Sequence, residues 1–206
     1  MGLKLKILSY WTPNFVINKM LEKVRIQTTA AFEKLLAVNS PQILNNKGSE
    51  ETAISRGIDQ KRAVVAKQHV KMVDALVAAV GREKAVNLGR TALFEVGKEL
   101  GQEVREMLGV GDNPNDLILA ARVLYRVLGI DFRVEWSGGN NAVLVVNRCA
   151  LASEYSELTC LVLSATDEGV MQGLNPTTQM RFRQYITDGA PACKADILFT
   201  GEIQKE

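Results

Sequence analysis

The chain of 206 residues lacks several features that usually reveal a function. It has a single histidine, and no cysteine stands before position 149. One histidine excludes hydrolase mechanisms that rest on paired imidazoles and metal sites that need several histidines. The sequence has neither a Gly-x-Ser-x-Gly nor a His-Glu-x-x-His segment, and "GVGDNP" lacks the Lys-Ser/Thr of a phosphate-binding loop. The common hydrolase and nucleotide-binding motifs are therefore absent.

Neither sign of charge dominates, and no long apolar run occurs. The 25 basic and 23 acidic side chains leave a net charge of +2 without any Lys/Arg-rich block, which argues against nucleic-acid binding. Apolar runs such as "ALVAAVG" fall far short of the roughly 18 residues of a spanning helix. The N-terminus lacks a signal-peptide pattern, and an odd number of cysteines favours a reducing compartment. We therefore expect a cytoplasmic protein with neither a nucleic-acid nor a membrane partner.

Hydrophobic periodicity divides the chain into a helical half and a mixed half. Helical spacing predicts helices over 11–38, 59–80, 82–109 and 112–129. Alternation and turn residues then predict a hairpin over 130–149, a helix over 156–172, and strands over 177–189 and 192–202. This order predicts an α+β fold in which an N-terminal helical half packs on a C-terminal four-stranded antiparallel sheet, strand-strand-helix-strand-strand. The polar "NSPQILNNKGSEE" indicates a boundary between a helical arm with its linker (1–48) and an α+β domain (49–206).

Two features of the helical half have both a structural and a functional explanation. Gly89, Gly97 and Gly101 share one stripe of a predicted helix, and an interior glycine costs about 1 kcal/mol relative to alanine. The stripe therefore predicts close approach of another backbone or of a ligand, and a homodimer through helices is one form of it. The single histidine, His69, lies on an apolar helix face, where a buried histidine with a hydrogen-bond partner is the simpler interpretation than a ligand or proton shuttle.

The three cysteines are crowded into the last quarter of the chain. Cys149 lies at a predicted strand end, Cys160 near a helix start and Cys193 at a strand start. An antiparallel sheet can bring three such positions to one edge, where thiolates can hold zinc or an iron–sulfur cluster, with His69, water or a substrate at the fourth position. The spacing of 11 and 33 residues is not that of structural zinc sites. Burial of each cysteine as a small apolar residue is the alternative.

Basic residues lie close to these cysteines in the sequence. They are Arg148, Arg181, Arg183 and Lys194. Nearby cations lower the pKa of a thiol and favour the thiolate, and a guanidinium group holds a carboxylate through two hydrogen bonds. We therefore predict that Arg181 and Arg183 bind a carboxylate of the substrate. A solvated strand face is the alternative.

The C-terminal quarter also carries a family resemblance. The pattern consists of Arg148-Cys149, Cys160, and Thr187, Gly189 and Cys193 before an apolar strand. It resembles the family named for L-2-amino-thiazoline-4-carboxylic acid hydrolase. That family is similar to 4-vinyl-reductase-type domains and to small subunits of Golgi tethering complexes, in which helices around an antiparallel sheet enclose an apolar ligand pocket.

The resemblance implies a hydrolase that acts on a C–N bond of a small cyclic, amidine-like carboxylate. It implies catalytic roles for Cys160, as nucleophile or metal ligand, and for Asp167, as proton acceptor. Cys193 can take the role of Cys160 in this scheme. The alternative function is a sensor or carrier that binds a small ligand, a metal or an iron–sulfur cluster without turnover. A third interpretation is a scaffold that dimerises through the glycine stripe.

Overall fold

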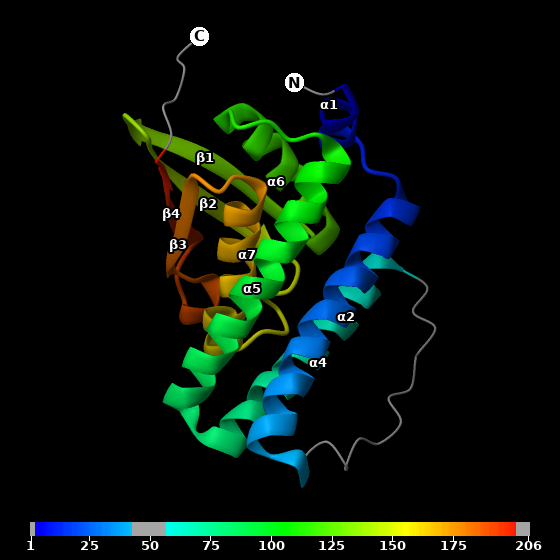
Figure 1. Cartoon of the computed structure of the whole chain (residues 1–206), viewed down its shortest axis with the longest axis vertical. Coiled ribbons are helices and arrows are strands. Elements are labelled where there is room, and N and C mark those ends of the chain that lie inside the picture. The colour runs from blue at the N-terminus through cyan, green and yellow to red at the C-terminus, as the bar shows by residue number, and fades with distance from the viewer. Residues whose placement is uncertain (1–2, 43–56, 201–206) are drawn as a thin grey trace.

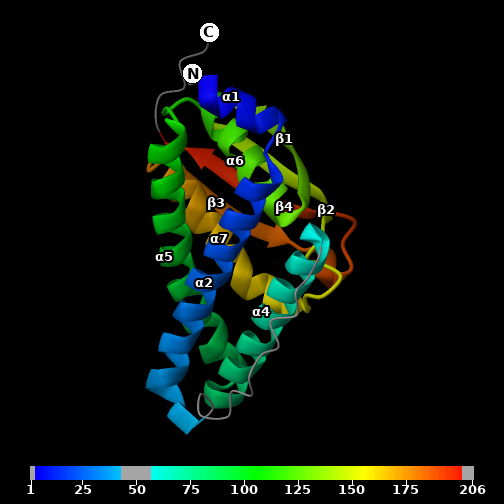
Figure 2. The same ribbon diagram turned by 90° about the vertical axis from the view of Figure 1, so that its right-hand side faces the viewer.

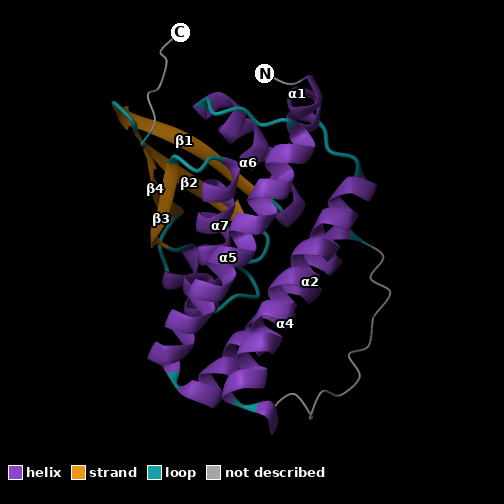
Figure 3. Ribbon diagram, viewed as in Figure 1, coloured by secondary structure: helices purple, strands orange, loops and turns teal. Residues whose placement is uncertain are grey.

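The computed structural model describes residues 3–42 and 57–200, and its α+β architecture confirms the predicted fold class. The helices are α1 (Leu3–Tyr10), α2 (Asn14–Asn39), α4 (Ile58–Val80), α5 (Arg82–Leu108), α6 (Pro114–Leu128), α7 (Glu157–Leu174) and a 3-10 turn η1 (Ile186–Asp188). The strands are β1 (Ile130–Gly138), β2 (Asn141–Cys149), β3 (Thr178–Gln184) and β4 (Cys193–Phe199). They form one antiparallel sheet in the order β1-β2-β4-β3, and Figure 3 shows helices and strands segregated into layers.

Helix α7 is the middle layer of the molecule. It lies between the sheet and α5 and contacts both β3 and α5 (Figure 1). Turned by 90°, the structure shows α2 in front of α7 and the sheet, with α5 along the left edge and α4 at the lower right (Figure 2). Because α7 is covered on both sides, its side chains form one wall of the space between the layers.

Local sequence signals begin and end the helices that surround this space. Asn113 caps α6 by accepting a hydrogen bond from the backbone N–H of Asp116 at 2.9 Å, and Gly129 ends the helix in the left-handed conformation, with φ 70°. Ser156 caps α7 by accepting from the N–H of Thr159 at 3.1 Å. The cap fixes where α7 begins, and it therefore places Cys160 in the first turns of the helix.

Helices α5 and α7 touch through glycines on both partners. A Cβ atom added at Gly97 would lie 2.0 Å from a backbone oxygen of α7, and one added at Gly169 would lie 2.0 Å from a backbone oxygen of α5. Gly101 and Gly173 meet the facing backbone in the same way, at 2.4 and 2.2 Å. Only glycine permits such a close approach, so these four positions set the distance between the two helices.

This contact confirms the prediction that another backbone approaches the glycine stripe. It also bears on the predicted homodimer. Gly97 and Gly101 of the stripe do meet another backbone, and Gly89 meets the side chain of Val162, but all of these atoms belong to α7 of the same chain, so the stripe is not a free surface for a second copy. The homodimer itself stays a prediction. Within the described residues, no helix is long and apolar enough to cross a membrane.

The elements differ from the predicted ones in two places. Helix α1 precedes the first predicted helix, which began at residue 11, and it forms because Leu5 is fully buried against the core. The strand predicted over 177–189 ends at Gln184, and a 3-10 turn follows from Ile186. The predicted domain boundary after residue 48 lies outside the described residues.

We predict that Gly97→Ala destabilises the fold by at least about 1–3 kcal/mol, because the added methyl group overlaps a backbone oxygen that cannot move without shifting α7. Gly57→Ala is the matched control, since nothing lies within 4 Å of a Cβ atom there. Urea unfolding followed by circular dichroism measures both. Equal stability of the two variants would contradict the packing described above.

Candidate functional site

A partly enclosed cavity of about 90 Å³ lies between α7, the sheet and helices α2, α4 and α6. At roughly 10–15 Å³ for one water, it has room for a small ring with a few substituents. Its walls are mostly apolar. The side chains with polar atoms are Thr28, His69, Tyr125, Cys149, Tyr155, Cys160, Ser164, Thr166, Asp167, Tyr185 and Cys193.

One face of α7 supplies the densest group of these side chains. Cys160, Ser164 and Asp167 line the cavity together with Leu163. Their spacing corresponds to positions i, i+3, i+4 and i+7, which fall on one side of a helix. The two residues predicted to be catalytic, Cys160 and Asp167, are therefore brought to the same cavity by the period of a single helix.

The three cysteines line this cavity from three elements. Cys149 ends β2, Cys160 lies on α7, and Cys193 begins β4, where it pairs with Val146 of β2. In the part of the chain that the structure describes, however, no group of three or more His, Cys, Asp or Glu side chains is arranged to hold a metal ion. The assignment of Cys149, Cys160 and Cys193 as ligands of zinc or an iron–sulfur cluster therefore stays a prediction.

The cysteines are thiols at neutral pH. Burial raises the pKa of Cys149 to about 11, although the backbone N–H groups of Leu151 and Ala152 act in the opposite direction. Burial raises the pKa of Cys160 to about 12, against a smaller effect of the neighbouring Thr187 side chain.

Burial also keeps the third thiol, that of Cys193, protonated, and the four basic residues predicted near the cysteines do not lower its pKa. Burial raises the pKa of Cys193, whose sulfur accepts a hydrogen bond from the N–H of Ile186 at 3.2 Å. The expectation that neighbouring cations favour thiolates is wrong, because none of the four basic residues lines the cavity. Arg148, for example, is exposed and pairs with Asp131 at 2.7 Å.

Asp167 is the carboxyl group of the cavity, and it has no partner. It forms no hydrogen bond or ion pair with any residue that the structure describes, and the accessible part of its side chain faces the cavity. Burial, and secondarily the charge of Glu168, raise the pKa of Asp167 to about 7. Such a group is divided between its acid and its base form at neutral pH, which suits proton transfer.

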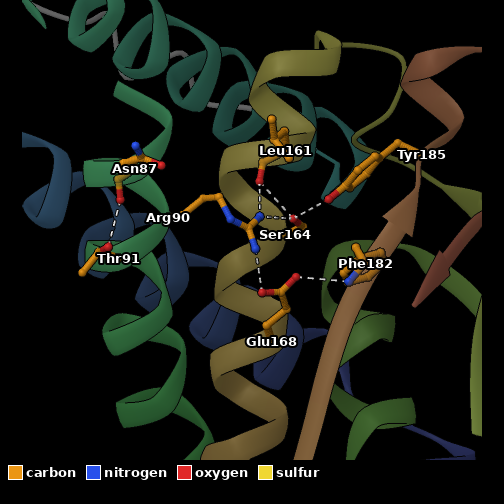
Figure 4. Close-up of polar contacts among 8 residues, drawn as sticks. All are labelled: Asn87, Arg90, Thr91, Leu161, Ser164, Glu168, Phe182 and Tyr185. Carbon is orange, nitrogen blue, oxygen red and sulfur yellow. Dashed lines mark hydrogen bonds and ion pairs between the residues drawn. The ribbon is translucent and has the colours of Figure 1, made fainter. Parts of the chain in front are cut away.

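The neighbouring carboxyl group, that of Glu168, does have hydrogen-bond and ion-pair partners. Glu168 is buried and pairs with Arg90 of α5 at 2.7 Å, and it accepts a hydrogen bond from the N–H of Phe182 at 3.1 Å (Figure 4). Arg90 also donates to the carbonyl oxygen of Leu161 at 2.5 Å and to the hydroxyl of Ser164 at 3.0 Å. The donors of Arg90 are thus directed at this network, and Asp167 receives no cation.

His69 is a structural residue by its contacts, in agreement with the simpler interpretation of the sequence. Its Nε2 lies 2.8 Å from the hydroxyl oxygen of Thr28, and its Nδ1 lies 2.6 Å from that of Tyr155. Burial lowers the pKa of His69 to about 4, so the ring is neutral at physiological pH. With both ring nitrogens hydrogen-bonded, His69 ties α2 and α4 to the chain segment that precedes α7.

The two arginines predicted to bind a carboxylate lie elsewhere. Arg181 and Arg183 are exposed side chains of β3, and neither lines the cavity. Arg183 pairs with Asp196 at 2.9 Å across the strands. Their role toward a substrate stays a prediction, and no lysine or arginine lines the cavity within the described part of the chain.

A second cavity adjoins the first. It measures about 380 Å³ and lies between α2, α5, α6 and α7 with mainly apolar walls. Both cavities share the side chains of Val24, Tyr125, Leu128, Thr166 and Asp167. Lys19, Lys23 and Glu103 also line the second cavity, and the last two form an ion pair between α2 and α5.

Sequence reasoning missed the tyrosines of the site. Tyr125 lines both cavities, and Tyr155 lines the first. Burial is the main reason that the pKa of each lies well above its ordinary value, so both hydroxyls remain protonated. The helical period places Tyr125 on the apolar face of α6, which is a signal that the sequence does contain. Tyr155 lies in a turn, where no periodicity points to it.

These features define a class: an α+β domain whose helices and antiparallel sheet enclose a mainly apolar cavity with thiol, hydroxyl and carboxyl groups in its wall. Residues 58–196 match the family model of L-2-amino-thiazoline-4-carboxylic acid hydrolase, and the chain belongs to this family. No curated protein matches the chain.

A solved structure of another protein shares the fold. It is trafficking protein particle complex subunit 3 from Naegleria fowleri covalently bound to palmitic acid, with 13% sequence identity and a TM-score of 0.56. The match covers 71% of this chain and 99% of the other. At this identity, the likeness concerns the fold alone.

We predict that the free energy of unfolding of the unchanged chain falls, relative to that of Asp167→Asn, as the pH rises from 4 to 7. The difference between the two chains should grow by about 1.4 kcal/mol per pH unit. In this window the folded chain keeps the Asp167 proton and the unfolded chain has lost it, so rising pH favours unfolding. The gap reaches about 4 kcal/mol above pH 7, and urea unfolding at several pH values measures it.

Asp188→Asn is the control for this prediction, because it makes the same substitution at an exposed aspartate. A constant gap for Asp167→Asn across pH 4–8 would show that its carboxyl group ionises alike in the folded and unfolded chain.

Proposed function

We propose that the chain is a hydrolase of the 2-amino-thiazoline-4-carboxylate type, which opens a C–N bond of a small cyclic carboxylate in the first cavity. One observation carries this proposal. Asp167 is a half-buried carboxyl group without a partner among the described residues, it lines the cavity, and its pKa of about 7 matches the pH at which it would act. The family match supports the reaction type.

The charge of the site fits the amidine part of such a substrate. A protonated amidine is a planar cation with two N–H donors, and a carboxylate accepts both of them at once. Asp167 offers this carboxylate in a cavity whose described lining includes no cationic side chain. Binding of the amidinium group would lower the pKa of Asp167 and keep it ionised, ready to accept a proton.

The reaction then needs one water molecule and one proton-transfer group. Water attacks the amidine carbon while Asp167 accepts its proton, which gives a tetrahedral carbon that carries a hydroxyl group. The C–N bond breaks as the protonated Asp167 returns the proton to the ring nitrogen. The hydroxyl proton then passes to the released amine, which becomes an ammonium group, and the carbon keeps the oxygen as a carbonyl group. Asp167 thus supplies the proton donor for the leaving nitrogen as well as the base.

Water is a better nucleophile here than Cys160. With a pKa of about 12, the thiol of Cys160 is almost never a thiolate at neutral pH, and the thiolate is the reactive form. We therefore assign Cys160 to the wall of the cavity beside the reacting atoms. Its role as nucleophile is the alternative that the experiment below separates.

The carboxylate of the substrate points toward the second cavity in this proposal. No cation lines the first cavity within the described residues, whereas Lys19 and Lys23 line the second. Asp167 belongs to both walls, so a substrate with its amidine at Asp167 can extend its carboxylate in that direction. Arg181 and Arg183 are not needed for this placement.

We predict that the purified chain hydrolyses 2-amino-thiazoline-4-carboxylate and that Asp167→Asn lowers kcat by about 10²-fold or more, because the amide can neither accept nor return the proton. Below about pH 7, kcat/KM should rise with pH, because this ratio reports the free chain, in which the base form of Asp167 is required. Product formation measured by mass spectrometry between pH 5 and 8 gives both quantities.

Two matched variants complete the test. Cys160→Ala should retain most of the activity, whereas a loss as large as that of Asp167→Asn would assign the nucleophile to Cys160. Asp188→Asn, with its exposed carboxyl group, should leave kcat unchanged. Absence of turnover in the unchanged chain would remove the proposal.

The second candidate function is binding of an apolar ligand without turnover, and the second cavity favours it. With about 380 Å³ and mainly apolar walls, this cavity is larger than a thiazoline ring requires. The un-ionised thiols also suit a passive wall. The structural neighbour is covalently bound to palmitic acid, which makes a long-chain carboxylic acid the ligand to test here.

We expect a fluorescent long-chain fatty acid to bind with a blue-shifted emission if this second function holds. Ala121→Phe should abolish the signal, because the new ring projects from a buried position in the wall of the second cavity. Val64→Phe, on an exposed position of α4, is the control. Equal binding by both variants would exclude the second cavity as the site.

A further inference from the structure

Large apolar side chains are exposed in a cluster at the start of the described chain. Ile7 is 54% exposed, Tyr10 77%, Trp11 68% and Phe15 74%. The first three share one helix face, since the N–H of Trp11 still donates to the carbonyl oxygen of Ile7 at 3.0 Å. We call these four residues the N-terminal aromatic patch. Isolated exposed apolar residues are ordinary, but four within so short a stretch mark an interaction surface.

The helix that carries the patch is held firmly on the fold. Leu5 is fully buried in the core that includes α6 and the sheet. Arg126 of α6 donates to the carbonyl oxygen of Ser9 at 2.9 Å, and the ammonium group of Lys4 donates to that of Met107 at 2.7 Å. These contacts hold the inner face of α1 against the fold. The side chains of its outer face are therefore exposed to solvent because of how the helix packs.

The stretch of chain that carries the patch has charges of one sign, whereas Glu103 of α5, which lines the second cavity together with Phe15, is paired with Lys23. Residues 3–21 contain three lysines and no acidic residue. Lys6 and Lys19 are exposed and form no ion pair with any residue in the described ranges. Aromatic rings beside unpaired lysines are the combination that favours the boundary between water and an anionic lipid layer, where rings enter the headgroup region and ammonium groups meet phosphates.

We propose that the N-terminal aromatic patch docks on an anionic membrane surface. The chain would lie on the bilayer without spanning it, so the proposal differs from the sequence-based expectation of no membrane partner, which rested on the lack of a spanning segment. Phe15 belongs both to the patch and to the lining of the second cavity. Docking therefore turns that apolar cavity toward the lipid. The proposal stands independently of any hydrolase activity.

The charges also disfavour a second copy of the chain as the occupant. A two-fold symmetric dimer places the same patch of both subunits face to face. Lys6 and Lys19 of one copy would then approach the lysines of the other without an acidic residue from this stretch between them. An anionic lipid surface reverses this repulsion into attraction.

Vesicle sedimentation tests the proposal with the full chain. We expect binding to vesicles of phosphatidylcholine with about a third phosphatidylserine, and at least tenfold weaker binding to pure phosphatidylcholine. A Trp136→Phe variant leaves Trp11 as the only tryptophan, and its emission should shift to the blue on the anionic vesicles. Each of Lys6→Gln and Lys19→Gln should weaken binding about fivefold.

Substitutions at the patch separate lipid docking from the alternatives. Tyr10→Ser combined with Trp11→Ser should lower binding at least tenfold, whereas Val38→Ser, which removes an exposed apolar side chain at the other end of α2, should not change it. Circular dichroism checks that each variant is folded. The proposal would be overturned if the chain did not bind to anionic vesicles. It would also be overturned if light scattering showed a dimer that becomes a monomer only in the Tyr10→Ser, Trp11→Ser variant.

Discussion

The backbone contact between α5 and α7 determines where the functional groups of α7 lie. Gly97 and Gly169 remove the side chains that would keep the two helices apart, so α7 sits deep between α5 and the sheet. One side of α7 then meets Arg90 of α5, and another side opens into the first cavity. Without this approach, Cys160 and Asp167 would lie in a wider and wetter space, and the burial that raises their pKa values would be lost.

Burial acts differently on two adjacent carboxyl groups of α7. Glu168 has the guanidinium group of Arg90 and a backbone N–H as partners, which offset the cost of placing a charge inside the protein. Asp167 has neither, so its charged form is disfavoured and its pKa rises to about 7. A fold selected only for stability would not leave such a carboxyl group facing an apolar cavity. The arrangement is typical of a site that transfers a proton or binds a cationic ligand.

Much of the fold could be predicted from the sequence, because its helices and strands follow simple periods and carry clear caps. The glycine stripe correctly indicated a close backbone neighbour, although the sequence could not say that this neighbour was α7. The convergence of Cys149, Cys160 and Cys193 on one cavity followed from their places at the ends of elements. The state of the thiols did not, because burial, which depends on the whole fold, outweighs the charge of residues nearby in sequence. Arg181 and Arg183 alternate with apolar residues on β3, and that alternation is the pattern of a solvated strand face.

The most direct test of this account is the titration of the Asp167 carboxyl group itself. Carbon-13 NMR of the side-chain carboxyls, with the resonance assigned by its absence in a variant, gives the ionisation midpoint in the folded chain. The account requires a midpoint near 7, about three units above that of an exposed aspartate. A midpoint near 4 would mean that water or an unseen partner solvates the charge, and Asp167 would then have no special role.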